Sequence, residues 1–420
     1  MRKGMFMIGM ALLLASGPAG CSDRAAASSD IPITYEYFPD EAFQEYLHNE
    51  FDLNKNHILE ESETLTIKSI VLESSGVQSL RGCELFPNLE EMRVSGSDFQ
   101  SLDVSGCKAL RVFNCSGSYL RELRVNGCDA LEELSCHNNL LTNLDVSGCR
   151  NLRRLFCDDN NLTDLNVKGC FNLEYLGCSH NGLSSLDVSG CDALKWLNCS
   201  NNILESLDKS GCLKLEEFDC HNNRLNALTV KHNTRLRYLD CSSNQLKSLD
   251  TGSSAALQEL YCRYNDIDYL DLRRSCVLLS LDCSTNLIRE LDLSWNTNLV
   301  KLYCENMYLE KLDLRHNTQL WDLKCSDNIL SELDLSENRK LNTLKCDGNR
   351  LKKLDLSQNH FLDIVECSNN ELLELDVTNL LCCRWLEVDL GVSVIGAEEN
   401  DIHVDYVPEE QELPEYHIVY

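Results

Sequence analysis

LEELSCHNNLLTNLDVSGCRN, residues 131–151, is followed without a gap by LRRLFCDDNNLTDLNVKGCFN, residues 152–172. The two segments share leucine, cysteine and asparagine at equivalent places, and the same register continues in both directions along the chain. The first cysteine of this unit recurs thirteen times at intervals of 21 residues, at 115, 136, 157, 178, 199, 220, 241, 262, 283, 304, 325, 346 and 367. Such a constant period indicates a repeat protein built from stacked coils.

The other positions of the unit keep the same register. With the recurring cysteine as position 6, Leu occupies positions 1 and 14 in all thirteen units, and Asn occupies position 9 in eleven. Because side chains alternate across a β-strand, those at positions 4 and 6 should point inward and those at 3 and 5 outward. A single coil buries too little apolar surface to offset the entropy lost on ordering it, so the coils must share one core.

This LxxLxCxxNxL pattern, followed by xxLDVSGC or a variant, resembles the leucine-rich-repeat family in the short form of bacterial internalin-like surface proteins. The resemblance covers about residues 67–391 and about 15 coils, counting degenerate ones at Leu72, Val94 and Val388. It implies a repeat solenoid with a parallel β-sheet on the concave face and an irregular or short-strand convex face. A small helical N-terminal cap and a β C-terminal cap are expected at its ends.

The 24 cysteines lie in ladders rather than in irregular pairs. At position 6, parallel strands hold neighbouring Cβ atoms about 4.8 Å apart, longer than a disulfide prefers. A second ladder, at position 19, changes from Cys to Asn or Ser after Cys212, which suits a half-buried turn and argues against obligatory pairing. We therefore expect free buried thiols, with a disulfide framework as the alternative. The pairs Cys136-His137 and Cys220-His221 lack zinc-site spacing and should point to opposite faces.

The start of the chain has the features of an export signal. Arg2 and Lys3 precede an apolar run at 5–15 that is too short to span a bilayer, and residues 1–20 are the expected signal peptide. Residues 17–21, GPAGC, resemble a bacterial lipobox, so we expect Cys21 to be lipidated and to anchor the protein to the cell envelope. Pro18 departs from the pattern, and simple cleavage with secretion is the alternative. Residues 21–33 are expected to form a flexible tether.

Residues 34–66 are expected to form the helical N-terminal cap, with a short amphipathic helix over 39–47. The following stretch, 52–63, resembles an EF-hand loop. Its expected calcium ligands are Asp52, Asn54, Asn56, the carbonyl of Ile58 and Glu63. His57 stands where such a loop has Gly, and only one of the first three ligands is charged, so calcium would be held with low affinity. The alternative is a metal-free turn, and no other cofactor is expected.

Residues 392–420 lose the leucine register and are expected to form the C-terminal cap and an acidic tail. Within them, the alternation of apolar and polar residues over 402–407 predicts a strand that pairs with the last coil.

The outward positions of the concave strands have no role in the core, so they carry the information about a partner. Aromatic and acidic residues gather there. The expected partner-binding residues are Phe156, Tyr175, Trp196, Asp219, Tyr238, Asp240, Tyr261, Tyr264, Asp282 and Tyr303. Aromatic side chains are typical anchors of protein interfaces and of sugar-stacking surfaces, and acids favour a cationic or hydroxyl-rich partner. The alternative is that these side chains only pack on one another along the ladder.

The balance of 38 basic against 67 acidic residues gives a formal charge of −29, which would repel nucleic acid and anionic membrane surfaces. No nucleophile elbow, phosphate loop or HExxH motif is found, so we expect no enzyme. The sequence predicts a monomeric, non-catalytic binding or adhesion protein that recognises a protein or glycan through its concave face. A passive surface spacer is the first alternative and a glycan-acting enzyme the second.

Overall fold

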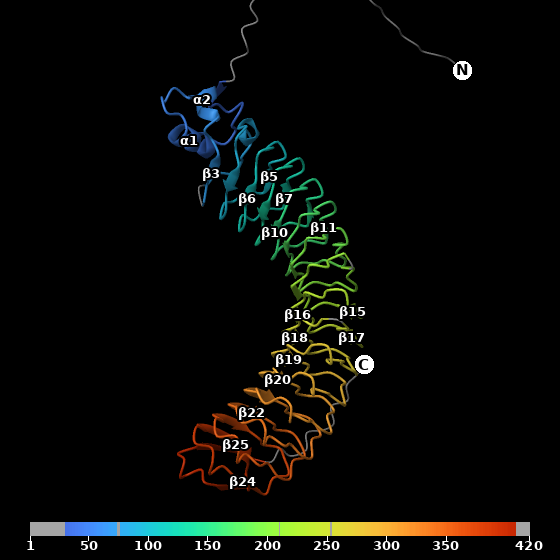
Figure 1. The fold of residues 1–420 in the computed structure, drawn as a ribbon. Helices are drawn as coiled ribbons and strands as arrows, with labels where there is room; N and C mark the ends of the chain where they lie inside the picture. The colour runs from blue at the N-terminus through green and yellow to red at the C-terminus, as the bar shows by residue number, and fades with distance from the viewer. Residues whose placement is uncertain (1–29, 74–75, 210, 253, 409–420) are drawn as a thin grey trace, which may run out of the picture.

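The computed structural model describes residues 30–73, 76–209, 211–252 and 254–408. Within these ranges the chain winds into a solenoid of about 16 turns that is bent into an arc (Figure 1). The expected signal peptide, the lipidation site Cys21 and the acidic tail after residue 408 lie outside the described residues. None of the described helices is long and apolar enough to cross a membrane.

Strands from successive turns join a parallel ribbon of seventeen strands along the inner side of the arc (Figure 1). In chain order they are β3 (Ser69–Val71), β4 (Glu91–Arg93), β6 (Val112–Asn114), β8 (Glu133–Ser135), β10 (Arg154–Phe156), β12 (Tyr175–Gly177), β13 (Trp196–Asn198), β14 (Glu217–Asp219), β16 (Tyr238–Asp240), β18 (Glu259–Tyr261), β19 (Ser280–Asp282), β20 (Lys301–Tyr303), β21 (Asp322–Lys324), β22 (Thr343–Lys345), β23 (Ile364–Glu366), β25 (Trp385–Asp389) and β27 (His403–Val407). Equivalent positions lie opposite each other, as Leu155 does to Leu176. The predicted concave sheet is therefore confirmed.

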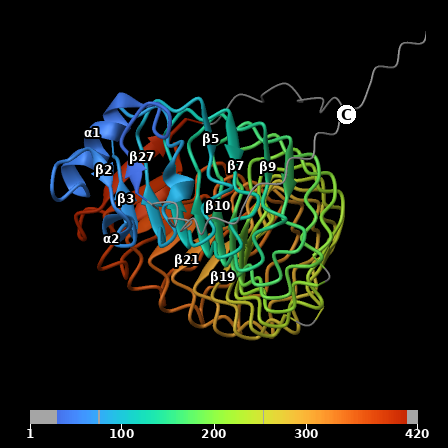
Figure 2. The ribbon, with the colours of Figure 1, turned by 90° about the horizontal axis from the view of Figure 1, so that it is seen from above.

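The outer side of the arc carries only short strands, in separate pairs. These are β5 (Ser101–Asp103) with β7 (Glu122–Arg124), β9 (Asn143–Asp145) with β11 (Asp164–Asn166), β15 (Leu228–Thr229) with β17 (Leu249–Asp250), and β24 (Glu374–Asp376) with β26 (Ser393–Ile395). Seen from above, the successive turns overlie one another and form a single stack (Figure 2). The short-strand convex face agrees with the prediction.

The core follows the predicted register. In the turn that begins at Leu131, the side chains of Leu131, Leu134, Cys136 and Leu141 are buried, and all thirteen cysteines at position 6 are fully buried. The described cysteines are free thiols. Burial raises the pKa of the Cys136 thiol, so it stays protonated and acts as an apolar filler.

The second ladder, at position 19, is fully buried, where we expected a half-buried turn. Cys128 Sγ donates to the Val104 carbonyl at 3.1 Å, and Asn296 Nδ2 donates to the equivalent Leu272 carbonyl at 3.1 Å. Both side chains thus donate to the equivalent buried carbonyl, which explains why Asn can replace Cys at this position. At the point of change, the buried ammonium of Lys209 donates to Asn233 Oδ1 at 2.9 Å.

The side chain of the asparagine at position 9 links two successive turns. Asn160 Oδ1 accepts from the Leu141 amide at 3.0 Å, and its Nδ2 donates to the Cys136 and Cys157 carbonyls at 3.0 and 3.1 Å. The residue before it lies in a left-handed turn, since Asp159 has φ 54°. These bonds supply partners for backbone groups that leave the sheet at this turn.

The N-terminal end contains two helices and one short strand pair. Helix α1 (Glu41–Glu50) starts at Asp40, whose side chain accepts from the Phe43 amide at 2.9 Å, and it buries Phe43 and Leu47. It is followed by α2 (Glu61–Thr64) and, beyond β3, by the 3₁₀ turn at Cys83–Leu85. The helix expected over 39–47 is thus present and ends three residues later. The role of these elements as a cap stays a prediction.

Two predicted boundaries are wrong. The tether does not extend to residue 33, because β1 (Ile31–Pro32) pairs antiparallel with β2 (Ile58–Leu59) and Ile33 is buried. The solenoid does not end at 391, because β26 extends the convex ladder and β27 pairs in parallel with β25. The strand expected over 402–407 is present as β27, so the turn-by-turn architecture continues to Val407.

Replacing Asn160 with Ala should destabilise the protein by about 2 to 4 kcal/mol, because the Leu141 amide and two buried carbonyls lose their partner. The neighbouring Asn161 is exposed, and its replacement by Ala should cost less than about 0.5 kcal/mol. Urea unfolding followed by circular dichroism measures both changes. Equal effects of the two substitutions would contradict the linking role of position 9.

Candidate functional site

The concave ribbon places equivalent outward residues in columns. Curvature draws these side chains together, so most of the residues predicted to bind a partner are half-buried. The half-buried ones are Phe156, Tyr175, Trp196, Asp219, Tyr238, Asp240, Tyr261 and Tyr303. They come from strands β10 to β20 and from one face of the sheet, so the structure brings them onto one surface.

Aromatic side chains of this surface pack on their neighbours. The rings of Phe156 and Trp196 lie 6.2 Å apart, and those of Tyr238 and Tyr261 lie 5.7 Å apart. Tyr175 lies on β12, between the strands of the first pair, and the Arg154 guanidinium is 5.4 Å from its ring centroid. Packing along the ladder, the alternative considered from the sequence, therefore accounts for part of the aromatic content.

The tyrosine hydroxyls also have fixed partners. Tyr261 donates to Glu259 Oε2 at 2.8 Å, and Tyr303 donates to Asp322 Oδ2 at 2.6 Å. The Lys324 ammonium lies 4.3 Å from the Tyr303 ring centroid. Burial, the hydrogen bond to Asp322 and nearby carboxylates raise the pKa of Tyr303, so its hydroxyl remains a donor. Rings held in this way lose little side-chain entropy when they contact a ligand.

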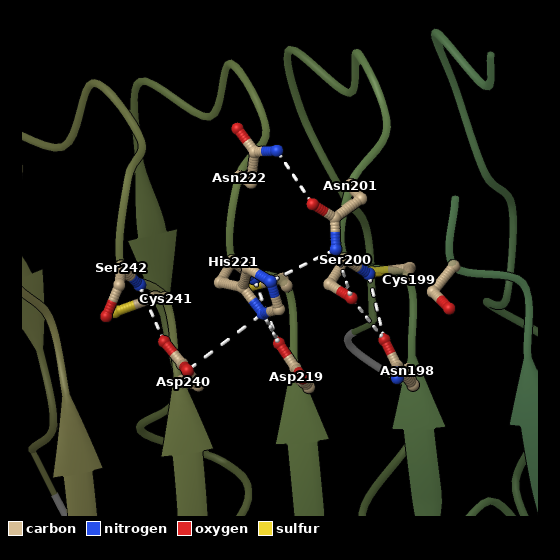
Figure 3. A network of polar contacts seen from close by, with 12 residues as sticks. Asn198, Cys199, Ser200, Asn201, Asp219, His221, Asn222, Asp240, Cys241 and Ser242 are labelled. Carbon is tan, nitrogen blue, oxygen red and sulfur yellow. Dashed lines mark hydrogen bonds and ion pairs between the residues drawn. The ribbon is translucent and has the colours of Figure 1, made fainter. Parts of the chain in front are cut away.

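A polar network lies at the ends of β13, β14 and β16 (Figure 3). His221 Nδ1 and Asp219 Oδ1 are 2.7 Å apart, and the same nitrogen is 4.0 Å from Asp240 Oδ2. On the other side of the ring, Asn201 Nδ2 lies 3.0 Å from His221 Nε2, and Asn201 Oδ1 accepts from Asn222 Nδ2 at 2.7 Å. These contacts fit an imidazole that donates from Nδ1 and accepts at Nε2.

Acidic groups outnumber basic ones in this part of the surface. Burial raises the pKa of Asp240, and Asp219 adds to that effect as a neighbouring like charge. Burial likewise raises the pKa of Glu305, further along the ribbon. The centre of the concave surface therefore favours a ligand that carries positive charge or donates hydrogen bonds.

Two of the predicted residues lie in different environments from the rest. Asp282 is only 6% exposed and accepts from the Ser284 amide at 3.1 Å, so its selection as a partner-binding residue is corrected. Neighbouring side chains cover it on the curved face. Tyr264 is 55% exposed because it occupies the left-handed turn after the strand, with φ 54°. The Arg263 guanidinium lies 5.6 Å from its ring centroid.

Sequence reasoning missed a column at position 2, along one edge of the ribbon. From 111 to 237 it alternates in sign: Arg111, Glu132, Arg153, Glu174, Lys195, Glu216 and Arg237. Glu174 contacts Arg153 at 2.6 Å and Lys195 at 2.5 Å. Alternating charges at a spacing of 21 residues were the signal for this ladder.

After Gln258 the same column is apolar in three successive turns, at Leu279, Val300 and Trp321. Leu279 is 41% exposed and Trp321 is 47% exposed. Large apolar side chains that remain exposed beside a sheet of fixed aromatics are typical of an interaction site.

The expected calcium loop lies at the N-terminal end, away from the concave surface. Asn54 Oδ1 accepts from the Asn56 amide at 3.0 Å, and Asn56 Oδ1 accepts from the Ile58 amide at 2.8 Å. The Glu63 carboxylate reaches the start of the loop, where its Oε1 accepts from the Leu53 amide at 2.8 Å. Side-chain oxygens of Asp52, Asn54, Asn56 and Glu63 thus accept from backbone amides of this loop.

One histidine precedes the loop and another lies within it. His48 Nδ1 lies 2.7 Å from Asp52 Oδ2, and the rings of His48 and His57 stack at 4.1 Å. His57 has φ 62°, the left-handed conformation that Gly would supply in an EF-hand loop. The left-handed turn is therefore present although the glycine is missing. Burial raises the pKa of Asp52, but hydrogen bonds from His48, His57 and Asn56 outweigh it, so the pKa of this carboxyl is lowered.

No family model and no curated protein matches the chain. Among solved structures it is similar to the functional domain of InlJ from Listeria monocytogenes, which includes a cysteine ladder. The TM-score is 0.73 at 30% identity, covering 89% of this chain and 80% of that one. A leucine-rich-repeat protein of Leptospira interrogans has TM-score 0.69 at 23% identity, covering 82% and 97%.

The plant peptide hormone receptor RGFR1, in complex with RGF2, has TM-score 0.61 at 15% identity, covering 81% of this chain and 70% of that one. At these lower identities, the Leptospira protein and RGFR1 share the solenoid fold alone with this chain.

Replacing Glu174 with Gln should lower stability by about 1 kcal/mol at neutral pH, since its two partners are exposed and screened. Hydrogen bonds from Lys195 and Arg153 lower the pKa of Glu174 to about 2. A lowered carboxyl pKa stabilises the fold above the unfolded value of about 4.3, and this contribution is lost as the pH falls toward 2. Urea midpoints at several pH values measure the difference, which should shrink below pH 4. A pH-independent difference would contradict the ion-pair origin.

Proposed function

Because the chain belongs to the internalin-like leucine-rich-repeat proteins, we propose that it is a non-catalytic binding protein whose concave sheet holds a protein or glycan partner. The observation that carries the proposal is the surface of half-buried aromatic and acidic side chains on strands β10 to β20. Such rings offer a large contact area with little entropic cost. Acids between them favour basic side chains or sugar hydroxyls.

A polypeptide partner has the stronger support. A solenoid of the same fold occurs in RGFR1 in complex with RGF2, so this architecture can present its surface to a peptide. The exposed Trp321 and Leu279 extend the aromatic surface at one edge, where they can bury apolar groups of a partner. A glycan would instead stack on the rings at the centre of the sheet.

The protein is proposed to act as a monomer outside the cell, held to the envelope by lipid on Cys21. The arrangement of signal-like residues 1–20 and the lipobox-like segment supports this placement. Release after ordinary cleavage is the other outcome. Fatty-acid labelling that is retained in Cys21→Ala would contradict the anchor.

Trp321→Ala should weaken partner binding by about thirtyfold, the loss expected for an interfacial anchor worth about 2 kcal/mol. Trp295 is a matched control, because it is 57% exposed but lies in the turn after the convex segment. Trp295→Ala should leave binding unchanged, and neither substitution should lower Tm. Pull-down with the mature chain and a glycan array identify the partner, and titration of the two variants measures the effect.

Ala at Trp196, Tyr238 or Tyr261 would also remove ring packing within the sheet, so Trp321 is the cleaner probe. If no partner is captured, or if Trp321→Ala and Trp295→Ala bind equally well, the passive-spacer alternative is favoured.

We also propose that Asp52, Asn54, Asn56, the Ile58 carbonyl and Glu63 hold a calcium ion. The turn that these residues form supports the proposal, because side-chain oxygens of Asp52, Asn54 and Asn56 already face inward to backbone amides. Oxygen ligands of this kind suit calcium. The single charge among the first three positions limits the affinity.

Calorimetry with calcium chloride should therefore give heat in the full chain, with a Kd of about 10⁻⁴ to 10⁻³ M. Glu63→Gln should abolish it, whereas Glu371→Gln, at a distant exposed site, should not. A flat titration of the unmodified chain at millimolar calcium would remove the proposal.

A further inference from the structure

Three side chains with metal-ligating atoms meet on the concave surface, at the carboxyl ends of β14 and β16. Asp219 and Asp240 are the last residues of these strands and lie opposite each other in the parallel register. His221 follows two residues after Asp219, and its ring lies beside both carboxylates (Figure 3). Ligand atoms of the three residues lie within 4.8 Å of one another. We propose that Asp219, His221 and Asp240 bind one zinc ion.

The distances suit a small divalent ion. Ligand atoms around tetrahedral zinc, at bond lengths near 2.0 to 2.1 Å, are about 3.3 Å apart. His221 Nδ1 is 2.7 Å from Asp219 Oδ1 and 4.0 Å from Asp240 Oδ2, and these two values bracket that spacing. Small side-chain rotations therefore place all three ligands around one centre.

Backbone hydrogen bonds hold the two carboxylates in place. Asp219 Oδ1 accepts from the His221 amide at 3.1 Å, and Asp240 Oδ1 accepts from the Ser242 amide at 2.9 Å. The second oxygen of Asp240 is the one that faces the imidazole. The site is thus positioned by strand register and turns before any ion enters.

The residue behind the imidazole also fits. A histidine that ligates through Nδ1 keeps its proton on Nε2 and donates it to an outer partner. Asn201 lies 3.0 Å from Nε2, and rotating its amide by half a turn presents Oδ1 as the acceptor. Asn222, which now donates to Asn201, is exposed and can turn to accept instead. The proton moves from Nδ1 to Nε2, and the neutral ring offers its lone pair to the ion.

Charge and ligand type select the ion. Two carboxylates in neighbouring strands repel each other, and a divalent cation between them removes that repulsion. Glu217 and Glu259, on β14 and β18, add negative charge nearby. One imidazole with two carboxylates suits zinc, whereas calcium and magnesium prefer oxygen ligands alone. The buried Cys220 thiol points into the core and takes no part.

The three ligands remain partly exposed, with side-chain exposures of 21% for Asp219, 35% for His221 and 20% for Asp240. A three-residue set on an open surface leaves at least one coordination position for water or for a group of a bound molecule. The zinc proposal does not depend on the partner proposed above, and its test contains no partner.

The test is calorimetric titration of the reduced full chain with zinc chloride, with bound zinc counted after dialysis. His221→Gln should remove one equivalent of zinc or weaken its binding at least tenfold. The matched control is His137→Gln, because His137 also follows the position-6 cysteine but has Ser135 in place of an acid. This control should bind as the unmodified chain does. Asn201→Gly, which suits the left-handed turn at position 8, should weaken binding by about 10- to 100-fold through loss of the outer hydrogen bond.

Asp240→Asn provides a second ligand variant if His221→Gln folds poorly, and circular dichroism identifies such a case. Loss of one equivalent in both ligand variants, with His137→Gln unaffected, supports the site. The proposal is overturned if the unmodified chain binds no zinc, or if folded ligand variants keep the same stoichiometry and affinity. Zinc held by the exposed thiols or by His48, Asp52 and His57 would be unaffected by these substitutions.

Discussion

The described structure depends on the stacking of turns of equal length in one register. Each turn completes hydrogen bonds that its neighbours leave open, and the position-9 asparagine is the clearest case. Asn160 accepts from the turn before it and donates to carbonyls of two turns. One inserted residue would displace that amide and the strand beside it, which explains why thirteen consecutive units show no insertion.

The common register stacks equivalent residues on both faces of the sheet, but the result differs between the inner and the outer face. Inside, it stacks identical leucines and thiols, which pack well because they are apolar. On the outward face, it places equivalent positions of neighbouring turns side by side. Three arrangements of side chains are found there. Charges alternate at position 2, rings pack on rings at the centre, and Asp219 and Asp240 meet across β14 and β16 with a histidine between them. The last arrangement creates a cation site from a repeated acid.

Much of the fold could be predicted because one period governs it. The inward direction of Leu134 and Cys136 follows from strand alternation, and the structure confirms it. Properties that depend on curvature could not be predicted from the period. Asp282 occupies an outward position yet is buried, and Tyr264 is exposed because position 8 requires a left-handed turn. Asn, Asp, Ser and Gly at that position carried a signal for the turn.

The cation site was missed for a related reason. The prediction that Cys220 and His221 point to opposite faces agrees with the structure, but it concerned only residues adjacent in the sequence. The two carboxylates beside His221 come from Asp219, two residues before it, and from Asp240, 19 residues after it in the next turn, and strand pairing brings them together. The repeat pattern does not predict the identity of a partner, because it fixes the core residues and leaves the outward residues free to vary.

The most direct test of the stacked interior is alkylation of the native chain, read by mass spectrometry at each cysteine. Among the described cysteines only Cys276 and Cys382 are exposed. These two thiols should react rapidly. The position-6 and position-19 thiols should react only after denaturation, because they are buried. Burial also raises the pKa of these thiols, in Cys128 to about 12, so little reactive thiolate is present. Rapid alkylation of Cys199 or Cys220 in the native chain, or disulfides in their place, would contradict the account.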